Sequence, residues 1–166
     1  QGEGGVNPAT MEFMQCLKSL CQEAGILLIL DEVQCGLGRT GYVMAFQYYG
    51  IQPDIVSLAK GLGGGFPIGA LLATDEAASG FAPGDHASTF GGNPLGCAVA
   101  DRVVEILSDP AFLAQVNDTS AYLQQKLQEV VLKDKRASGL RGRGLLIGIE
   151  FSADVKALID ICQKNG

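Results

Sequence analysis

The chain has 166 residues with a net charge of −6, and 47% of its residues are hydrophobic, which is enough for a globular domain with a buried core. The acidic balance and the lack of a Lys/Arg-rich run argue against nucleic acid as a partner, because phosphate binding needs a basic face, and the apolar runs are too short to span a bilayer. The five cysteines form no C-x-x-C pair and favour reduced thiols in a cytoplasmic protein over a disulfide framework or a zinc site.

The first predicted element is an amphipathic helix that begins near Asn7 and Pro8. Asn7 is expected to cap this helix, Pro8 to occupy its first position and Gly25 to end it. The uninterrupted apolar run Ile26–Leu30 follows. Its length and composition predict a parallel strand that is buried on both faces.

Two further apolar runs predict more strands. Ile55–Leu58 follows Pro53-Asp54, and Ile68–Ala73 follows the glycine-rich loop Gly61–Pro67. Helix and strand therefore alternate, which is typical of an α/β fold, and residues 1–92 are expected to supply several strands of a mostly parallel sheet with flanking helices.

The pattern changes to long helices from Asn93 onward. Asn93 and Asp109 each precede a proline and an apolar helical repeat, so each predicts a helix start. Arg136–Gly144 is interpreted as a polar connection, Leu145–Phe151 as a strand and Ser152–Lys164 as a short helix. The shift in composition near Asn93 is the candidate domain boundary.

Two side chains at the ends of predicted strands could carry chemistry. Asp31 ends the first strand, and Lys60 follows the second strand among small residues that let a ligand approach the backbone closely. Taken alone, Asp31 is more often a turn carboxylate and Lys60 a solvated surface group. Together they match pyridoxal phosphate (PLP), which needs an amine to form a Schiff base and a carboxylate beside its pyridine nitrogen.

The sequence also contains features of two other kinds of site, a dinucleotide site and a site that depends on histidine. Gly36–Gly41 matches the G-x-G-x-x-G pattern of dinucleotide sites, but Asp31 and Glu32 precede it and would disfavour a pyrophosphate. The segment Tyr42–Tyr49 also lacks the cap of a phosphate-binding helix. His86 is the only histidine, so a metal cluster or a Ser–His–Asp triad would depend on it alone, and no metal site is expected.

Several motifs, in this order, resemble the class III aminotransferases, which are fold-type I PLP enzymes. They are Ile29–Gln34, Gly36–Gly41, Pro53–Val56, Ala59–Gly65 and, downstream, His86–Leu95. The resemblance extends over nearly the whole chain. It implies a large PLP domain with an α/β fold and a smaller α+β domain.

The same resemblance implies roles for four residues around the cofactor. Lys60 would form the Schiff base and then shuttle a proton, and Asp31 would pair with the pyridine nitrogen. Val33 would pack on one face of the ring. Gln34 would donate a hydrogen bond to the phenolic oxygen of the ring.

Two more residues are assigned by resemblance, at the dimer interface and at the substrate. Thr89 would reach across a homodimer to the phosphate of the neighbouring cofactor. Glu3 matches a glutamate beside the substrate, with a plain loop carboxylate as the alternative. Arg39, Arg141 and Arg143 could hold a substrate carboxylate, but solvated or salt-bridged arginines are the more common case.

Within the family, the segments Gln1–Ala9 and Gly63–Ala70 are most similar to acetylornithine aminotransferases. That subgroup exchanges the δ-amino group of N-acetylornithine with 2-oxoglutarate in arginine biosynthesis. Ornithine, succinylornithine and succinyl-diaminopimelate remain alternative amino donors.

Family members are longer than this chain, which opens without Met, so a fragment is expected. Residues 1–92 would be the C-terminal part of the large PLP domain, and residues 93–166 would be the connecting helices and the beginning of the small domain. The alternative is that the isolated chain is a non-catalytic folding or assembly unit.

Overall fold

The computed structural model describes residues 1–165, which form an α/β fold with two sheets. The strands are β1 (Ile29–Asp31), β2 (Ile55–Leu58), β3 (Ala70–Ala73), β4 (Ala137–Arg143) and β5 (Leu146–Phe151). The helices are α1 (Met11–Ala24), α2 (Asp75–Ala78), α3 (Pro94–Leu107), α4 (Pro110–Val130) and α5 (Lys156–Asn165), with three 3-10 turns, η1 (Ala45–Tyr49), η2 (Lys60–Gly63) and η3 (Val131–Lys133). No helix within residues 1–165 is long and apolar enough to cross a membrane.

Helix α1 ends where the sequence predicts but begins later. Gly25 ends it in a left-handed conformation with φ 65°. The prediction that Asn7 caps the helix is wrong, because the hydroxyl of Thr10 accepts the N–H of Phe13 at 3.2 Å instead. The amide of Asn7 is already used within the N-terminal turn, where it donates to the carbonyl of Gly4 at 2.7 Å.

The larger sheet has the order β1-β2-β3, with one parallel and one antiparallel pair. β1 runs parallel to β2, as expected. β3 runs antiparallel to β2, which differs from the expectation of parallel strands. The reason is the connection between Leu58 and Ala70, which contains only the turn η2 and lacks the crossover helix that a parallel return needs.

Both outer strands of this sheet expose apolar side chains. The prediction that Ile26–Leu30 is buried on both faces is wrong: Leu28 is buried, whereas Ile29 is 59% exposed. On the other edge, Leu71 in β3 is 55% exposed. β2 is the buried strand, because it alone has a hydrogen-bonded neighbour on each side within the described residues.

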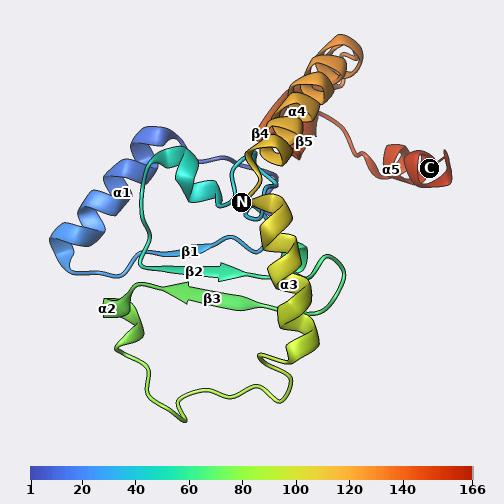
Figure 1. Ribbon diagram of the computed structural model, residues 1–166. Helices are drawn as coiled ribbons and strands as arrows, with labels where there is room; N and C mark the ends of the chain where they lie inside the picture. Colours follow the sequence, from blue (N-terminus) through green and yellow to red (C-terminus); the bar gives the residue numbers. More distant parts are fainter. Residues whose placement is uncertain (166) are drawn as a thin grey trace.

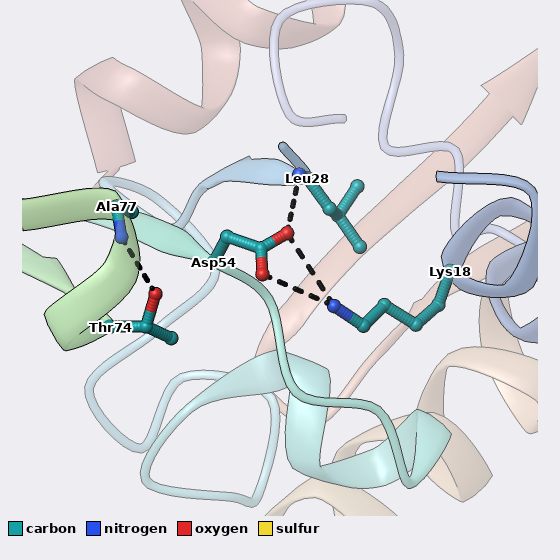
Figure 2. A network of polar contacts seen from close by, with 5 residues as sticks. All are labelled: Lys18, Leu28, Asp54, Thr74 and Ala77. Atoms are coloured by element: carbon teal, nitrogen blue, oxygen red, sulfur yellow. Dashed lines mark hydrogen bonds and ion pairs between the residues drawn. The ribbon is translucent and has the colours of Figure 1, made fainter. Parts of the chain in front are cut away.

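Asp54 clamps the starting ends of β1 and β2 together (Figure 2). Its carboxylate accepts the N–H of Leu28 at 2.7 Å and lies 3.4 Å from the Nζ atom of Lys18 on α1. The bond from Leu28 first, and then Lys18, lower the pKa of Asp54 below its usual value. Beside it, the hydroxyl of Thr74 accepts the N–H of Ala77 and caps α2. This network involves only the starting ends of β1 and β2, so it does not occupy their opposite ends.

The helices after residue 93 begin as predicted. The side chain of Asn93 accepts the N–H of Gly96 at 2.8 Å and caps α3, and that of Asp109 accepts the N–H of Ala111 at 2.8 Å and caps α4. Helix α3 crosses the end of the three-stranded sheet (Figure 1). It packs on the core cluster of Leu37, Val56, Leu58 and Leu62 through Ala100 and Leu107.

The smaller sheet is a hairpin of β4 and β5, in which Arg143 pairs with Leu146. The prediction that Arg136–Gly144 is a connection is wrong, because most of that segment is strand β4. Its glycines conceal the strand pattern, yet Gly144, with φ 57°, makes the tight turn that returns the chain. Helix α5 begins at Lys156, and in Figure 1 it lies apart from the other helices.

Candidate active site

A cleft of about 1010 Å³ opens where β1 and β2 end. The side chains at the carboxyl ends of these two parallel strands, Asp31 and Lys60, both line it. The N-terminal turn, the 3-10 turn η1 and the turn between β4 and β5 supply the other walls. The structure thus brings together the amine and the carboxylate that the sequence analysis paired, at the edge of the sheet where α/β folds bind ligands.

Lys60 stands directly after β2 with a constrained backbone. Its φ of 48° lies in the left-handed region, which costs a non-glycine residue about 1–3 kcal/mol and persists only where the surroundings enforce it. Here Leu62 is buried and donates its N–H to the carbonyl of Ala59 at 3.0 Å, which fixes the turn. The Lys60 amine has no hydrogen-bond or ion-pair partner within residues 1–165, so it is available to a ligand.

Asp31 is held at the last position of β1, in register with Ser57. One carboxylate oxygen, Oδ1, accepts the N–H of Val33 at 2.9 Å. This bond is the contact expected of a turn carboxylate, which was the alternative interpretation of Asp31. The second oxygen has no partner among the described residues, so the turn orients a carboxylate that can still bind a cation.

Val33, Gln34 and Glu3 line the same cleft. The Nε2 atom of Gln34 donates to the Oε1 atom of Glu3 at 3.2 Å, which joins the N-terminal turn to the segment after β1. Gly2 makes this approach possible, because a Cβ atom at Gly2 would collide with the amide of Gln34. Gln34 therefore contacts Glu3 in this structure.

Thr89 does not lie in the cleft. It belongs to the long segment between α2 and α3, which extends away from the sheet at the bottom of Figure 1. The surrounding residues are exposed, and the side chain of Phe90 is 80% exposed. The structure brings five of the six expected site residues, Glu3, Asp31, Val33, Gln34 and Lys60, to one cleft and leaves Thr89 outside it.

Glu32 supports the wall of the cleft, a role that was not predicted from the sequence. Glu32 is 2% exposed, and its carboxylate accepts the N–H groups of Ala45 at 2.7 Å and of Phe46 at 2.8 Å, which anchors η1. Burial raises the pKa of Glu32 above its usual value, and the two backbone bonds oppose that rise. The sequence shows only the acidic pair Asp31-Glu32 directly after the apolar run Ile26–Leu30, and the role of Glu32 follows from its contacts with η1.

Arg143, for which the sequence favoured a solvated or salt-bridged side chain over a ligand of a substrate carboxylate, lies on the cleft wall. Its guanidinium carbon lies 3.1 Å from the ring centroid of Tyr48 and 5.8 Å from that of Tyr42. On the same wall, the hydroxyl of Tyr49 donates to the carbonyl of Ala9 at 3.2 Å, and burial raises the pKa of Tyr49. The aromatic run at residues 42–49 was the available signal.

The residues of the cleft fit a pyridine aldehyde. An amine, a carboxylate with one free oxygen, an amide and an apolar valine face a space large enough for a cofactor. These are the groups that PLP needs for its aldehyde, its ring nitrogen, its phenolic oxygen and its ring face. Within residues 1–165, no group of three or more His, Cys, Asp or Glu side chains is arranged to hold a metal ion.

Comparison with known sequences gives one family over the full length. The family model "Aminotransferase class-III" matches residues 1–166. The chain is 52% identical over 166 residues to the acetylornithine aminotransferase of Clostridium acetobutylicum, covering 99% of this chain and 43% of that protein. It is 50% identical over 155 residues to the acetylornithine/succinyldiaminopimelate aminotransferase of Buchnera aphidicola, covering 93% of this chain and 38% of that protein.

Comparison with solved structures agrees with the sequence match. The ornithine δ-aminotransferase of Plasmodium falciparum superimposes with a TM-score of 0.90 at 39% identity, covering 99% of this chain and 43% of that one. The chain therefore has the fold of the corresponding part of that enzyme. It spans about two-fifths of the length of these relatives.

Proposed function

Because the chain belongs to the class-III aminotransferases, which are PLP enzymes, we propose that its cleft is the cofactor-binding part of an aminotransferase active site. The chain would be part of a longer protein that transfers an amino group from a small-molecule donor to a 2-oxo acid. The observation that carries the proposal is the position of Lys60 and Asp31, which follow neighbouring parallel strands and line one cleft.

Each of these residues of the cleft would have a separate role in binding the cofactor or in the reaction. The amine of Lys60 would hold the cofactor through its aldehyde carbon and later move a proton at the reacting carbon. Asp31 would stabilise the proton on the ring nitrogen through its free oxygen, since an anion favours the charged form of a nearby base. PLP, when bound, supplies the electron sink of the reaction. Val33 would cover one ring face, and Gln34 would donate to the phenolic oxygen.

Other roles concern the whole protein. Thr89 would bind the phosphate of the neighbouring subunit's cofactor in a homodimer, and its exposed segment outside the cleft supports this proposal. Glu3 would lie beside the substrate. Residues 1–92 would belong to the large PLP domain and residues 93–166 to the connecting helices and the start of the small domain. A cytoplasmic location is proposed from the five free cysteines.

For the substrates we propose N-acetylornithine and 2-oxoglutarate, in arginine biosynthesis. Acetylornithine occurs in the names of the two relatives described above. Ornithine, succinylornithine and succinyl-diaminopimelate are the alternatives, and the names of the Plasmodium and Buchnera enzymes favour the first and the last of these. Initial rates of the full-length protein with each donor and 2-oxoglutarate would rank them.

Covalent labelling tests the site itself. The full-length protein is incubated with PLP, reduced with borohydride and mapped by peptide mass spectrometry. We expect a pyridoxyl group on Lys60, its loss in Lys60→Ala, and its retention in the control Lys126→Ala, because Lys126 pairs with Glu129 on the surface of α4. A label on a different lysine in the unmodified protein would contradict the assignment.

The same labelling experiment distinguishes a second candidate function from the first. If the isolated 166-residue chain is a non-catalytic folding or assembly unit, it will show no label on Lys60 although the full-length protein does. Circular dichroism of the isolated chain would establish that it is folded during the measurement. A labelled and folded isolated chain would contradict this alternative.

A further inference from the structure

Glu32 is a buried carboxylate to which the proposed reaction assigns no role. Its two oxygens each accept one backbone N–H at the start of η1, Oε2 from Ala45 and Oε1 from Phe46. The backbone of Glu32 is also held, because its N–H donates to the carbonyl of Ser57 in β2 at 3.0 Å. Glu32 therefore fastens the start of η1 to the end of the larger sheet through two charge-assisted hydrogen bonds.

The other end of η1 holds the N-terminal turn, residues Gln1–Asn7. Tyr49 is the last residue of η1, and its hydroxyl donates to the carbonyl of Ala9 at 3.2 Å. Ala9 lies two residues after the turn, which is closed by the bond from the N–H of Asn7 to the carbonyl of Gln1 at 3.0 Å. Through η1, the turn is thus connected to Glu32.

The same turn is attached a second time to the segment that contains Glu32. The Nε2 atom of Gln34 donates to Glu3 at 3.2 Å, but this bond is exposed, and water competes for both of its partners. The bond from Tyr49 to Ala9 is partly buried and supplies the second attachment. These contacts form a closed network, here called the wall network, whose members all line the cleft: Glu3, Ala9, Glu32, Gln34, Phe46 and Tyr49.

Two attachments restrict the turn more than one, because each removes freedom that the other leaves. Position matters at such a wall, since a displacement of about 1 Å can cost about 100-fold in rate. Resting on the proposed function, in which Glu3 lies beside the substrate, we propose that Glu32 is a positioning residue. It holds η1 and the N-terminal turn at the distance from Lys60 that the amino donor needs, and it acts through Tyr49 and Glu3 without touching the reacting atoms.

Glu32→Gln in the full-length PLP-loaded protein tests the first link of the wall network. The amide keeps the size of the side chain but presents an NH2 group to one of the two backbone N–H groups, so one bond is lost. At unchanged borohydride label on Lys60, the KM for N-acetylornithine should rise about 10- to 100-fold. A loss of folded protein would instead lower kcat and the label together at constant KM. The control is Glu105→Gln, on the surface of α3, where Glu105 pairs with Arg102.

Tyr49→Phe tests the second link and removes only a hydroxyl, so it also serves if Glu32→Gln does not fold. The KM should rise about 3- to 10-fold, as for one neutral hydrogen bond. Tyr48→Phe is the matched control, because the Tyr48 hydroxyl has no hydrogen-bond partner within residues 1–165 and its ring, which packs on Arg143, is kept. The double variant should match Glu32→Gln alone, since both changes break the same connection.

Hydrogen exchange gives a readout that does not depend on activity. Within the N-terminal turn, Gly5 and Val6 both donate their N–H groups to the carbonyl of Gly2 at 3.0 Å. Deuterium uptake by a peptide of residues 1–9 in the full-length protein should be about 3- to 10-fold faster in both variants, because the turn opens more often. Uptake by peptides of α4 should be unchanged.

Each contrary result has a distinct meaning. An unchanged KM in Glu32→Gln or Tyr49→Phe at full label would overturn the inference. Effects that multiply in the double variant would show that the two residues act separately, which contradicts the wall network. A fall in kcat and label at constant KM would leave Glu32 with a stabilising role only. Absence of label on Lys60 in the unmodified protein would contradict the proposed function, and this inference with it, whereas the other results contradict the inference alone.

Discussion

The position of Gln34 depends on the absence of a side chain at Gly2. A Cβ atom there would meet the end of a flexible side chain and not the backbone, so Gly2→Ala should move Gln34 without unfolding the protein. We expect PLP affinity of the full-length protein to fall about 3- to 10-fold, as for the loss of one hydrogen bond, with the melting temperature unchanged. Titration with PLP and a thermal melt measure the two quantities.

Gly4→Ala is the control for that prediction. It adds the same methyl group to the same turn, where the new atom would lie 3.2 Å from the side chain of Gln1 and away from Gln34. Its PLP affinity should match that of the parent. Equal weakening by both variants would mean that the turn as a whole, and not Gln34, is disturbed.

Asp54 should make the free energy of unfolding depend on pH in the acidic range. Its pKa is lower in the folded state than in the unfolded chain, so its contribution is present above the unfolded pKa of about 3.8 and is lost as the pH falls through the folded value. Asp54→Asn should lower the free energy of unfolding at pH 7 by about 1–3 kcal/mol and remove this acid-dependent loss. Urea unfolding between pH 7 and pH 3 measures both effects, and a parallel decline of both proteins would contradict the role.

Among the secondary-structure elements, the β4–β5 hairpin depends most on one turn. Gly144 has φ 57°, and its Cβ atom would lie 2.6 Å from the Cα atom of Thr40, which is backbone and cannot move aside. Gly144→Ala should therefore lower the free energy of unfolding by about 2–4 kcal/mol, measured by urea unfolding. Gly139→Ala, in the same strand with open space around it, should change it little.

Elements with local signals were predictable from the sequence, and elements defined by contacts were not. Gly25, Asn93 and Asp109 end or begin helices through bonds within one turn, which the sequence displays directly. Strand β4 has no such signal, because its glycines and arginines alternate without an apolar face until β5 pairs with it. The direction of β3 likewise depends on a connection whose path only the fold defines.

The same distinction holds for the candidate site. Asp31 and Lys60 were identified because the carboxyl ends of parallel strands are a position that sequence alone can locate. The anchoring by Glu32 and the stacking of Arg143 were not foreseen. Both join segments that are remote or irregular in the chain, so no periodic pattern marks them.

Considered as a whole, the molecule leaves apolar strands at both edges of its larger sheet. Ile29 in β1 is 59% exposed, and Leu71 and Leu72 in β3 are 55% and 48% exposed. Such edges favour association. The isolated 166-residue chain should therefore self-associate in light scattering, and Leu71→Lys should shift it toward the monomer. Leu158→Lys on α5, outside the sheet, is the control, and a monomeric parent chain would contradict the prediction.

The clamp at Asp54 and the cleft at Lys60 lie at opposite ends of the same two strands. This separation has an evolutionary consequence. Mutations that change ligand preference at one end need not weaken the contacts that keep the strands aligned at the other. Ligand specificity could therefore evolve through substitutions around the cleft, while selection for a stable fold acts on other residues.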